Sequence, residues 1–207
     1  LERPVFNSNG TKLVFSAKTK GGKWSIYIYD LLTSHVTRVF QTNENARFPY
    51  YSPDDRFIVF TSDFGGNEQI ELINTENPSV RVRVTANDSR NSLPVWSRVY
   101  PGEITDDELQ KKIQSKLAFV SEQNNYRGIY YVYLSHEGDD ALSIYDLVKK
   151  RVAGDQPDTA ALEITTSAVE GDYPCFTGDG RHLIFQYYDG VQDRLKKVDL
   201  ENNFDAL

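Results

Sequence analysis

Histidine, cysteine and carboxylate side chains are the groups of this 207-residue chain that could do acid–base, nucleophilic or metal chemistry. The three histidines, His35, His136 and His182, are far apart in the sequence and fall on a turn or outer strand, a loop tip and a polar strand position. We expect each to be a surface residue, and a metal-dependent lyase acting on oligosaccharides would need its histidines grouped. The sequence also has no Gly-X-Ser-X-Gly nucleophile elbow, no glycine-rich phosphate loop and no His-Glu-X-X-His zinc motif. It therefore predicts no catalytic residue, and we expect the chain not to be an enzyme in itself.

Acidic residues cluster at three places, Asp54-Asp55, Asp106 to Glu108 and Asp139-Asp140. None of these clusters has the spacing of a calcium loop with a central glycine. The first pair lies in a tight turn, where Asp side chains bond the backbone just ahead, and the second group begins a predicted helix. We therefore expect structural roles for both and no cofactor or metal, with a calcium ion bound by loops as the alternative.

Charge and hydropathy limit the classes of partner. The chain has 30 acidic and 23 basic residues, a net charge of −7, which argues against a nucleic-acid partner held through phosphate contacts. No run of about 18 apolar residues occurs, so the sequence predicts no membrane-spanning helix. A single cysteine, Cys175, excludes an intrachain disulfide. It follows Pro174, at a position where other parts of the chain carry Val5, Tyr50 and Val95, so we expect a buried strand residue.

The elements that must position these side chains recur at a fixed spacing. An apolar, β-branched strand ends in a phenylalanine 11 residues after a proline in three places: Pro4 and Phe15, Pro49 and Phe60, and Pro174 and Phe185. From Pro94 to Phe119 the interval is 25 residues, which indicates an insertion of about 14 residues between two strands. Successive prolines are 45, 45 and 80 residues apart. A period near 45 with several short strands per unit is typical of propeller blades.

The segment from Pro49 to Asn74, PYYSPDDRFIVFTSDFGGNEQIELIN, resembles the TolB-like β-propeller repeat. That repeat has a proline, an aromatic residue, Ser-Pro-Asp-Gly, a strand ending in Phe, and a Gly-Asn turn before another strand. The segments FNSNGTKLVF and FTGDGRHLIF are similar to it. The resemblance implies an all-β fold, a β-propeller of four-stranded antiparallel blades. It would cover residues 1–207 with repeat units at about 3–46, 47–91, 92–166 and 167–207.

Two parts of the chain depart from the repeat. Residues 102–115, GEITDDELQKKIQS, predict a short helical insert, since Thr105 can cap its N-terminus and lysines lie toward its end. The fourth unit ends without an outer strand. Because propellers protect their edges by closing the ring, we expect four units of a six- or seven-bladed ring, with a complete four-bladed ring as the alternative.

The outer strand of the second unit alternates between apolar and basic residues. Val80, Val82 and Val84 would share one face, and Arg81 and Arg83 the other. We expect these arginines to form a solvated face of the sheet.

The resemblance also implies a site. In TolB-like proteins the loops that lead into the first strand of each blade gather on one face, and the mouth there receives a partner polypeptide. Arg47, Asn67, Arg90 and Asp172 are the residues expected to bind that partner. The function implied is non-catalytic protein–protein interaction in the periplasm or another extracytoplasmic cell-envelope complex of a bacterium. The alternative is the substrate-gating propeller of a larger prolyl-oligopeptidase-like or tricorn-like peptidase.

Overall fold

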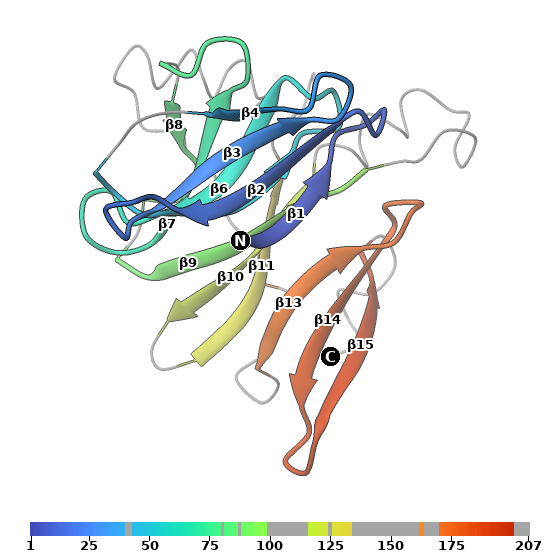
Figure 1. The fold of residues 1–207 in the computed structure, drawn as a ribbon. Helices are drawn as coiled ribbons and strands as arrows, with labels where there is room; N and C mark the ends of the chain where they lie inside the picture. Colours follow the sequence, from blue (N-terminus) through green and yellow to red (C-terminus); the bar gives the residue numbers. More distant parts are fainter. Residues whose placement is uncertain are drawn as a thin grey trace. The chain divides into compact units, whose positions relative to one another are not determined.

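The computed structural model describes residues 1–39, 43–79, 81–86, 88–98, 116–123, 126–133, 162–163 and 170–200 (Figure 1). Within these ranges the regular structure consists of strands alone. The helix predicted for residues 102–115 lies outside the described residues, as does His136. No helix that could span a membrane occurs in the described part of the chain. The chain divides into two compact units, Leu1–Pro94 and Val95–Leu207.

The first unit contains two four-stranded antiparallel sheets, each with its strands in sequence order. The first sheet consists of β1 (Glu2–Phe6), β2 (Lys12–Lys18), β3 (Trp24–Asp30) and β4 (His35–Arg38). The second consists of β5 (Ala46–Tyr51), β6 (Phe57–Ser62), β7 (Gln69–Asn74) and β8 (Arg81–Arg83).

The remaining strands also form two antiparallel sheets. One consists of β9 (Arg90–Trp96), β10 (Lys116–Gln123), β11 (Tyr126–Tyr133) and β12 (Leu162–Glu163), and β9 runs across the division between the units. The other has three strands in the described residues, β13 (Gly171–Phe176), β14 (His182–Tyr188) and β15 (Asp193–Asp199). The predicted all-β architecture of antiparallel blades is thus confirmed, while the exact unit boundaries stay a prediction.

A β-bulge recurs in the first strand of three sheets, and a backbone feature that accompanies it occurs in all four. The residue before the proline has positive φ in all four strands: Arg3 at 43°, Phe48 at 55°, Leu93 at 55° and Tyr173 at 48°. Pairing with the second strand shifts by one residue at this point in β1, β5 and β13. A bulge bends its strand and re-aims the side chain next to it. It therefore sets the direction of the residue two places before the proline, which is Glu2, Arg47 or Asp172.

The turns after β1, β5 and β13 are closed by the same bonds. Asn7, Ser52 and Thr177 stand three residues after their prolines, and the side-chain oxygen of each accepts a hydrogen bond from the backbone N–H five residues later, at 2.8, 2.9 and 3.2 Å. The backbone N–H of each donates back to the carbonyl of that same later residue. A polar side chain that replaces a backbone partner in this way is typical of tight turns.

Asp55 occupies a turn position that otherwise holds glycine. The sixth residue after the proline has positive φ in three turns: Gly10 at 71°, Asp55 at 60° and Gly180 at 65°. The Asp55 carboxylate accepts hydrogen bonds from the backbone N–H and the hydroxyl of Ser8, at 2.8 and 2.6 Å. It thereby links the turn of the second sheet to the turn of the first. The structural role predicted for the Asp54-Asp55 pair is confirmed.

The core of the first unit lies between its two sheets. Val14 and Ile26 of the first sheet pack in one cluster with Tyr51, Ile58 and Phe60 of the second, and all five are at most 2% exposed. Four of these residues lie on β2, β3 and β6, each of which has a neighbouring strand on both sides, and Tyr51 lies on β5. Burial of this apolar area is the main stabilising contribution to the unit.

The prediction of a solvated face for Arg81 and Arg83 was wrong. Both arginines form ion pairs with Glu71 on the neighbouring strand β7, and Arg81 also contacts Glu44 at 2.9 Å. The Glu71 side chain is only 1% exposed, and burial raises its pKa although two guanidinium groups lie beside it. A buried carboxylate needs a paired cation, so these half-buried arginines balance the charge of Glu71 and do not form a fully solvated face.

The prediction of a buried Cys175 was also wrong, because the residue is exposed in the described part of the chain. Cys175 pairs with Ile184 on β14, and Gln186, two residues further on, pairs with Leu195 on β15, so these residues share one face of the sheet. Leu195 is 76% exposed on that face. The equivalence of Cys175 with Val5, Tyr50 and Val95 could not show whether another sheet covers this face.

Candidate functional site

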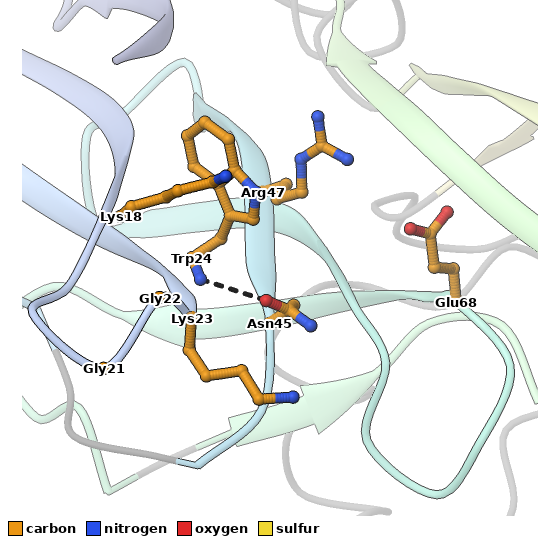
Figure 2. A pocket seen from close by; sticks show the side chains of 8 residues that line it. All are labelled: Lys18, Gly21, Gly22, Lys23, Trp24, Asn45, Arg47 and Glu68. Atoms are coloured by element: carbon orange, nitrogen blue, oxygen red, sulfur yellow. Dashed lines mark hydrogen bonds between the residues drawn. The ribbon is translucent and has the colours of Figure 1, made fainter.

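A hollow lies at the end of the first unit where the β2–β3 turn and the β6–β7 turn meet the start of β5. Its volume is about 480 Å³. The residues that line it are Lys18, Gly21, Gly22, Lys23, Trp24, Asn45, Arg47 and Glu68 (Figure 2). All of them belong to the first unit. We call this end of the unit, defined by those two turns and Asn45 to Arg47, the hairpin end.

The Trp24 indole is flanked by cations. The Lys18 Nζ lies 5.5 Å from a ring centroid of the indole, and the Arg47 guanidinium carbon lies 4.9 Å from it. Figure 2 shows both side chains next to the half-buried ring. Cations within about 6 Å of an aromatic face are attracted by its quadrupole. The indole therefore holds two positive side chains at the wall of the hollow.

Arg47 is oriented by more than the indole. Its Nε and Nη2 atoms donate to the two carboxylate oxygens of Glu2, at 3.0 and 2.9 Å, and its guanidinium also lies 4.5 Å from the ring of Phe48. Glu2 and Arg47 occupy the same position before the bulge in successive sheets. A bidentate pair of this kind fixes the plane of the guanidinium.

Asn45 joins the turn of the first sheet to the second sheet. Its side-chain oxygen accepts the backbone N–H of Trp24 at 3.0 Å, the dashed line in Figure 2. Its backbone and side-chain N–H groups donate to the Asp63 carboxylate, both at 2.7 Å. This arrangement fixes the floor of the hollow through hydrogen bonds that are complete without a ligand.

Glu68 and Asn67, at the β6–β7 turn, contact the segment that leads into β9. Glu68 accepts a hydrogen bond from the Nε of Arg90 at 2.7 Å, and the Asn67 amide donates to the carbonyl of Asp88 at 2.8 Å. Arg90 remains 52% exposed, so this pair is largely solvated and contributes little to stability. Three of the predicted partner-binding residues, Arg47, Asn67 and Arg90, are thus brought to the hairpin end of one unit.

Asp172 belongs to the second unit, where its carboxylate forms a two-pronged pair with Arg127. The Nη2 and Nε atoms of Arg127 lie 3.0 and 3.1 Å from the two Asp172 oxygens. Arg127 also pairs with Glu122. Like Arg47, Asp172 immediately precedes a bulge and pairs with a residue 45 positions earlier. Each of these four residues has a partner inside the protein. The role predicted for Arg47, Asn67, Arg90 and Asp172 in partner binding stays a prediction.

Sequence reasoning missed Lys18, Lys23 and Trp24. The signal was a Gly-Gly turn flanked by lysines and followed directly by a tryptophan, but hairpin turns often carry lysines for solubility alone. In the described ranges, no group of three or more His, Cys, Asp or Glu side chains lies close enough together to hold a metal ion.

Comparison with known proteins identifies relatives of this fold. Residues 2–103 match the family model for the TolB beta propeller domain. The structure of a putative TolB from Agrobacterium tumefaciens is 16% identical with a TM-score of 0.66, and the alignment covers 94% of this chain and 60% of that one. TolB from Acinetobacter baumannii is 15% identical with a TM-score of 0.67, covering 98% of this chain and 41% of that one.

An enzyme also has a similar fold. A puromycin-hydrolyzing peptidase from Mycobacterium tuberculosis is 14% identical with a TM-score of 0.58, and the alignment covers 96% of this chain but 27% of the peptidase. At these identities the likeness concerns the fold alone. The chain spans 60% and 41% of the length of the two TolB proteins it matches. The resemblance to TolB-like repeats seen in the sequence is confirmed by the family match.

Proposed function

We propose, from the premise that the chain is a β-propeller of TolB type, that its role is non-catalytic and that it docks another polypeptide at the hairpin end. The observation that supports this most directly is the hollow at that end, about 480 Å³ in volume. Binding sites are usually concave and largely pre-formed. Here Asn45 and Arg47 are held by internal bonds before any partner arrives.

The chemistry of the hollow favours a polypeptide over a small substrate. Its lining combines an indole, an amide and charged groups of both signs, and it is open to solvent. Aromatic and arginine side chains are enriched where proteins bind one another. We propose an extracytoplasmic location in a bacterial envelope complex, which rests on the TolB relatives and not on a residue of this chain.

Site-specific photocrosslinking tests this function. A photoreactive benzoylphenylalanine placed at Lys20, exposed in the β2–β3 turn, should crosslink the full-length protein to one discrete polypeptide in its own host. The matched control places the same group at Glu76, exposed in the β7–β8 turn at the opposite end of the second sheet. A crosslink from Glu76 as strong as from Lys20, or none from either, would overturn the proposal.

A second candidate follows from the likeness to the peptidase. In that case the chain would be the substrate-gating propeller of a larger hydrolase, whose catalytic residues lie outside this sequence, because the sequence has no nucleophile elbow. Labelling of the full-length protein with a fluorophosphonate probe, which reacts with activated serines, separates the two candidates. Covalent labelling favours the peptidase, and its absence in a correctly folded protein favours the docking role.

A further inference from the structure

We propose that the hollow at the hairpin end recognises carboxylate groups of an acidic peptide segment, through Lys18 and Lys23. This rests on the proposed docking function and specifies the chemistry of its partner. Some charges of the lining are neutralised inside the protein, and only the others are available to a ligand. The lining contains three cations, Lys18, Lys23 and Arg47, and one anion, Glu68.

Two of these four charges have partners inside the protein. Arg47 is bound by both oxygens of Glu2, and Glu68 is bound by Arg90. Within the residues that the structure describes, Lys18 and Lys23 form no ion pair, although Lys18 contacts the Trp24 ring. The charge that remains available to a ligand is therefore that of the two lysines. It is positive in a chain whose net charge is −7.

The positions of the lysines suit a peptide. Lys18 ends β2 and Lys23 precedes β3, so they flank the Gly21-Gly22 turn, and both are exposed. Figure 2 shows Lys18 beside the indole and Lys23 on the other side of Asn45, lower in the same hollow. Two carboxylates separated along an extended peptide can reach the two ammonium groups. An apolar side chain between them can contact the part of Trp24 that the cations leave open.

The same geometry disfavours phosphate. Phosphate groups are typically bound by a bidentate guanidinium or by a cradle of backbone N–H groups. The single arginine of the lining already gives its bidentate edge to Glu2, and the backbone N–H of Trp24 is bonded to Asn45. An ammonium group is a compact point charge that pairs readily with a carboxylate. A carboxylate ligand is therefore the better match.

A titration with matched peptides tests this inference. The full-length protein is labelled with fluorotryptophan, and the fluorine resonance of Trp24 is assigned by its loss in a Trp24→Phe variant. The probe is acetyl-Glu-Gly-Phe-Gly-Glu-amide, whose two Glu and one Phe side chains share one face of an extended chain, and the control peptide carries Gln in place of both Glu residues. We expect a saturable shift of the Trp24 resonance with the acidic peptide and an apparent affinity at least about tenfold weaker with the Gln peptide.

The protein variants make the test specific. The K18Q/K23Q double variant should weaken binding of the acidic peptide by about tenfold, because two charge pairs are lost. The control K12Q/K197Q removes two exposed lysines elsewhere and should leave the affinity unchanged. Equal weakening by both double variants would show a nonspecific charge effect and overturn the inference. So would equal binding of the two peptides, or an equal shift of the resonance with inorganic phosphate at matched ionic strength.

The two proposals fail in different ways. If Lys20 still crosslinks a polypeptide and the K18Q/K23Q variant crosslinks it equally well, the docking function stands and the carboxylate inference is wrong. If the photoreactive group at Lys20 gives no crosslink, with or without the K18Q/K23Q substitutions, but the acidic peptide still binds through the lysines, the docking function is wrong. The hollow then still recognises carboxylates.

Discussion

The backbone N–H of Ser97 donates to the carbonyl of Lys116 at 2.9 Å. The same bond joins residues only five apart in three other turns: Asn7 and Lys12, Ser52 and Phe57, and Thr177 and His182. Ser97 and Lys116 are 19 residues apart and still occupy the equivalent places after Pro94. The insertion of about 14 residues inferred from the sequence therefore begins and ends at a turn that the repeat closes in its usual way.

Replacing residues 98–115 with the four-residue turn Gly-Asp-Gly-Arg, taken from residues 178–181, should leave the fold intact. The bond between Ser97 and Lys116 then closes a turn of the usual length, and shortening the segment that connects two strands changes the loop-closure entropy only slightly. We expect a melting temperature within about 5 °C of the wild type and an unchanged far-ultraviolet circular dichroism spectrum. Loss of cooperative unfolding would show that the replaced segment supports the sheet.

Glu71→Ala should lower the free energy of unfolding by about 3 kcal/mol, because it leaves Arg81 and Arg83 without their buried counter-charge. Urea denaturation at neutral pH measures the effect. Glu76→Ala is the matched control, since Glu76 is exposed, and it should change the free energy by less than about 0.5 kcal/mol. Equal effects of the two substitutions would show that the ion pairs of Glu71 with Arg81 and Arg83 do not stabilise the fold.

Asp55→Ala should cost about 2 kcal/mol, since it removes the hydrogen bonds from Ser8 and places a Cβ-bearing apolar residue at a φ of 60°. Asp55→Gly keeps the turn relaxed and should cost less. A double-mutant cycle with Ser8→Ala measures the part of this link that the Ser8 hydroxyl supplies, and we expect a coupling energy of about 1 kcal/mol. Additive effects would mean that the hydroxyl bond does not couple the turns, since the backbone N–H of residue 8 still donates to Asp55 in the variant.

Arg47→Ala should lower the free energy of unfolding by about 1 kcal/mol, through loss of the Glu2 pair and the contacts with Trp24 and Phe48. Arg47→Lys should recover only part of this, because an ammonium group cannot form the bidentate pair. Thermal unfolding of the two variants beside Lys20→Ala, an exposed control, measures the difference. If Arg47→Ala changed the stability no more than Lys20→Ala, the internal contacts of Arg47 would not stabilise the fold.

The lowered pKa of Asp179 makes the stability of the folded protein depend on pH. Burial disfavours its ionised form, but hydrogen bonds from the Thr177 hydroxyl and the Arg181 N–H outweigh burial, so its pKa lies below the usual 3.8. A carboxyl group with a lowered pKa in the folded state stabilises the protein above its unfolded pKa. That contribution is lost as the pH falls below 3.8 through the folded value.

The measurement compares wild type with Asp179→Asn by urea denaturation from neutral pH to about pH 3. The variant should be less stable at neutral pH, and the difference should shrink in acid. Asp193→Asn removes an exposed carboxyl group of the same sheet as a control. A difference that stays constant down to the lowest pH would show that the Asp179 charge is not responsible.

The sequence predicted the strands because local patterns determine them. The interval from proline to phenylalanine located the first two strands of each sheet, and the Gly-Gly turns located the hairpins. Burial was harder to predict, because it depends on what lies above a face. Arg81 and Arg83 alternate as an exposed strand would, yet the neighbouring strand places Glu71 beside them. Glu71 in the middle of an apolar strand was the one local signal for this.

The candidate site could be predicted only in part. The resemblance to TolB-like repeats predicted that the loops on one face bind a partner, and Arg47, Asn67 and Arg90 do lie at the hairpin end. It could not show that each of them has an internal partner, since those partners are 21 to 45 residues away in the sequence. The hollow itself is built from three separate segments that only the folded sheets bring together. Lys18 and Lys23 become a pair of available charges only once the partners of Arg47 and Glu68 are known.

Cys175 has a practical consequence. It carries the one thiol of this sequence, and that thiol is exposed on the β13–β15 sheet, in a different unit from the hollow. A maleimide dye can therefore be attached to this segment at a single defined position without engineering the chain. The dye would leave Lys18, Lys23 and Trp24 chemically unmodified.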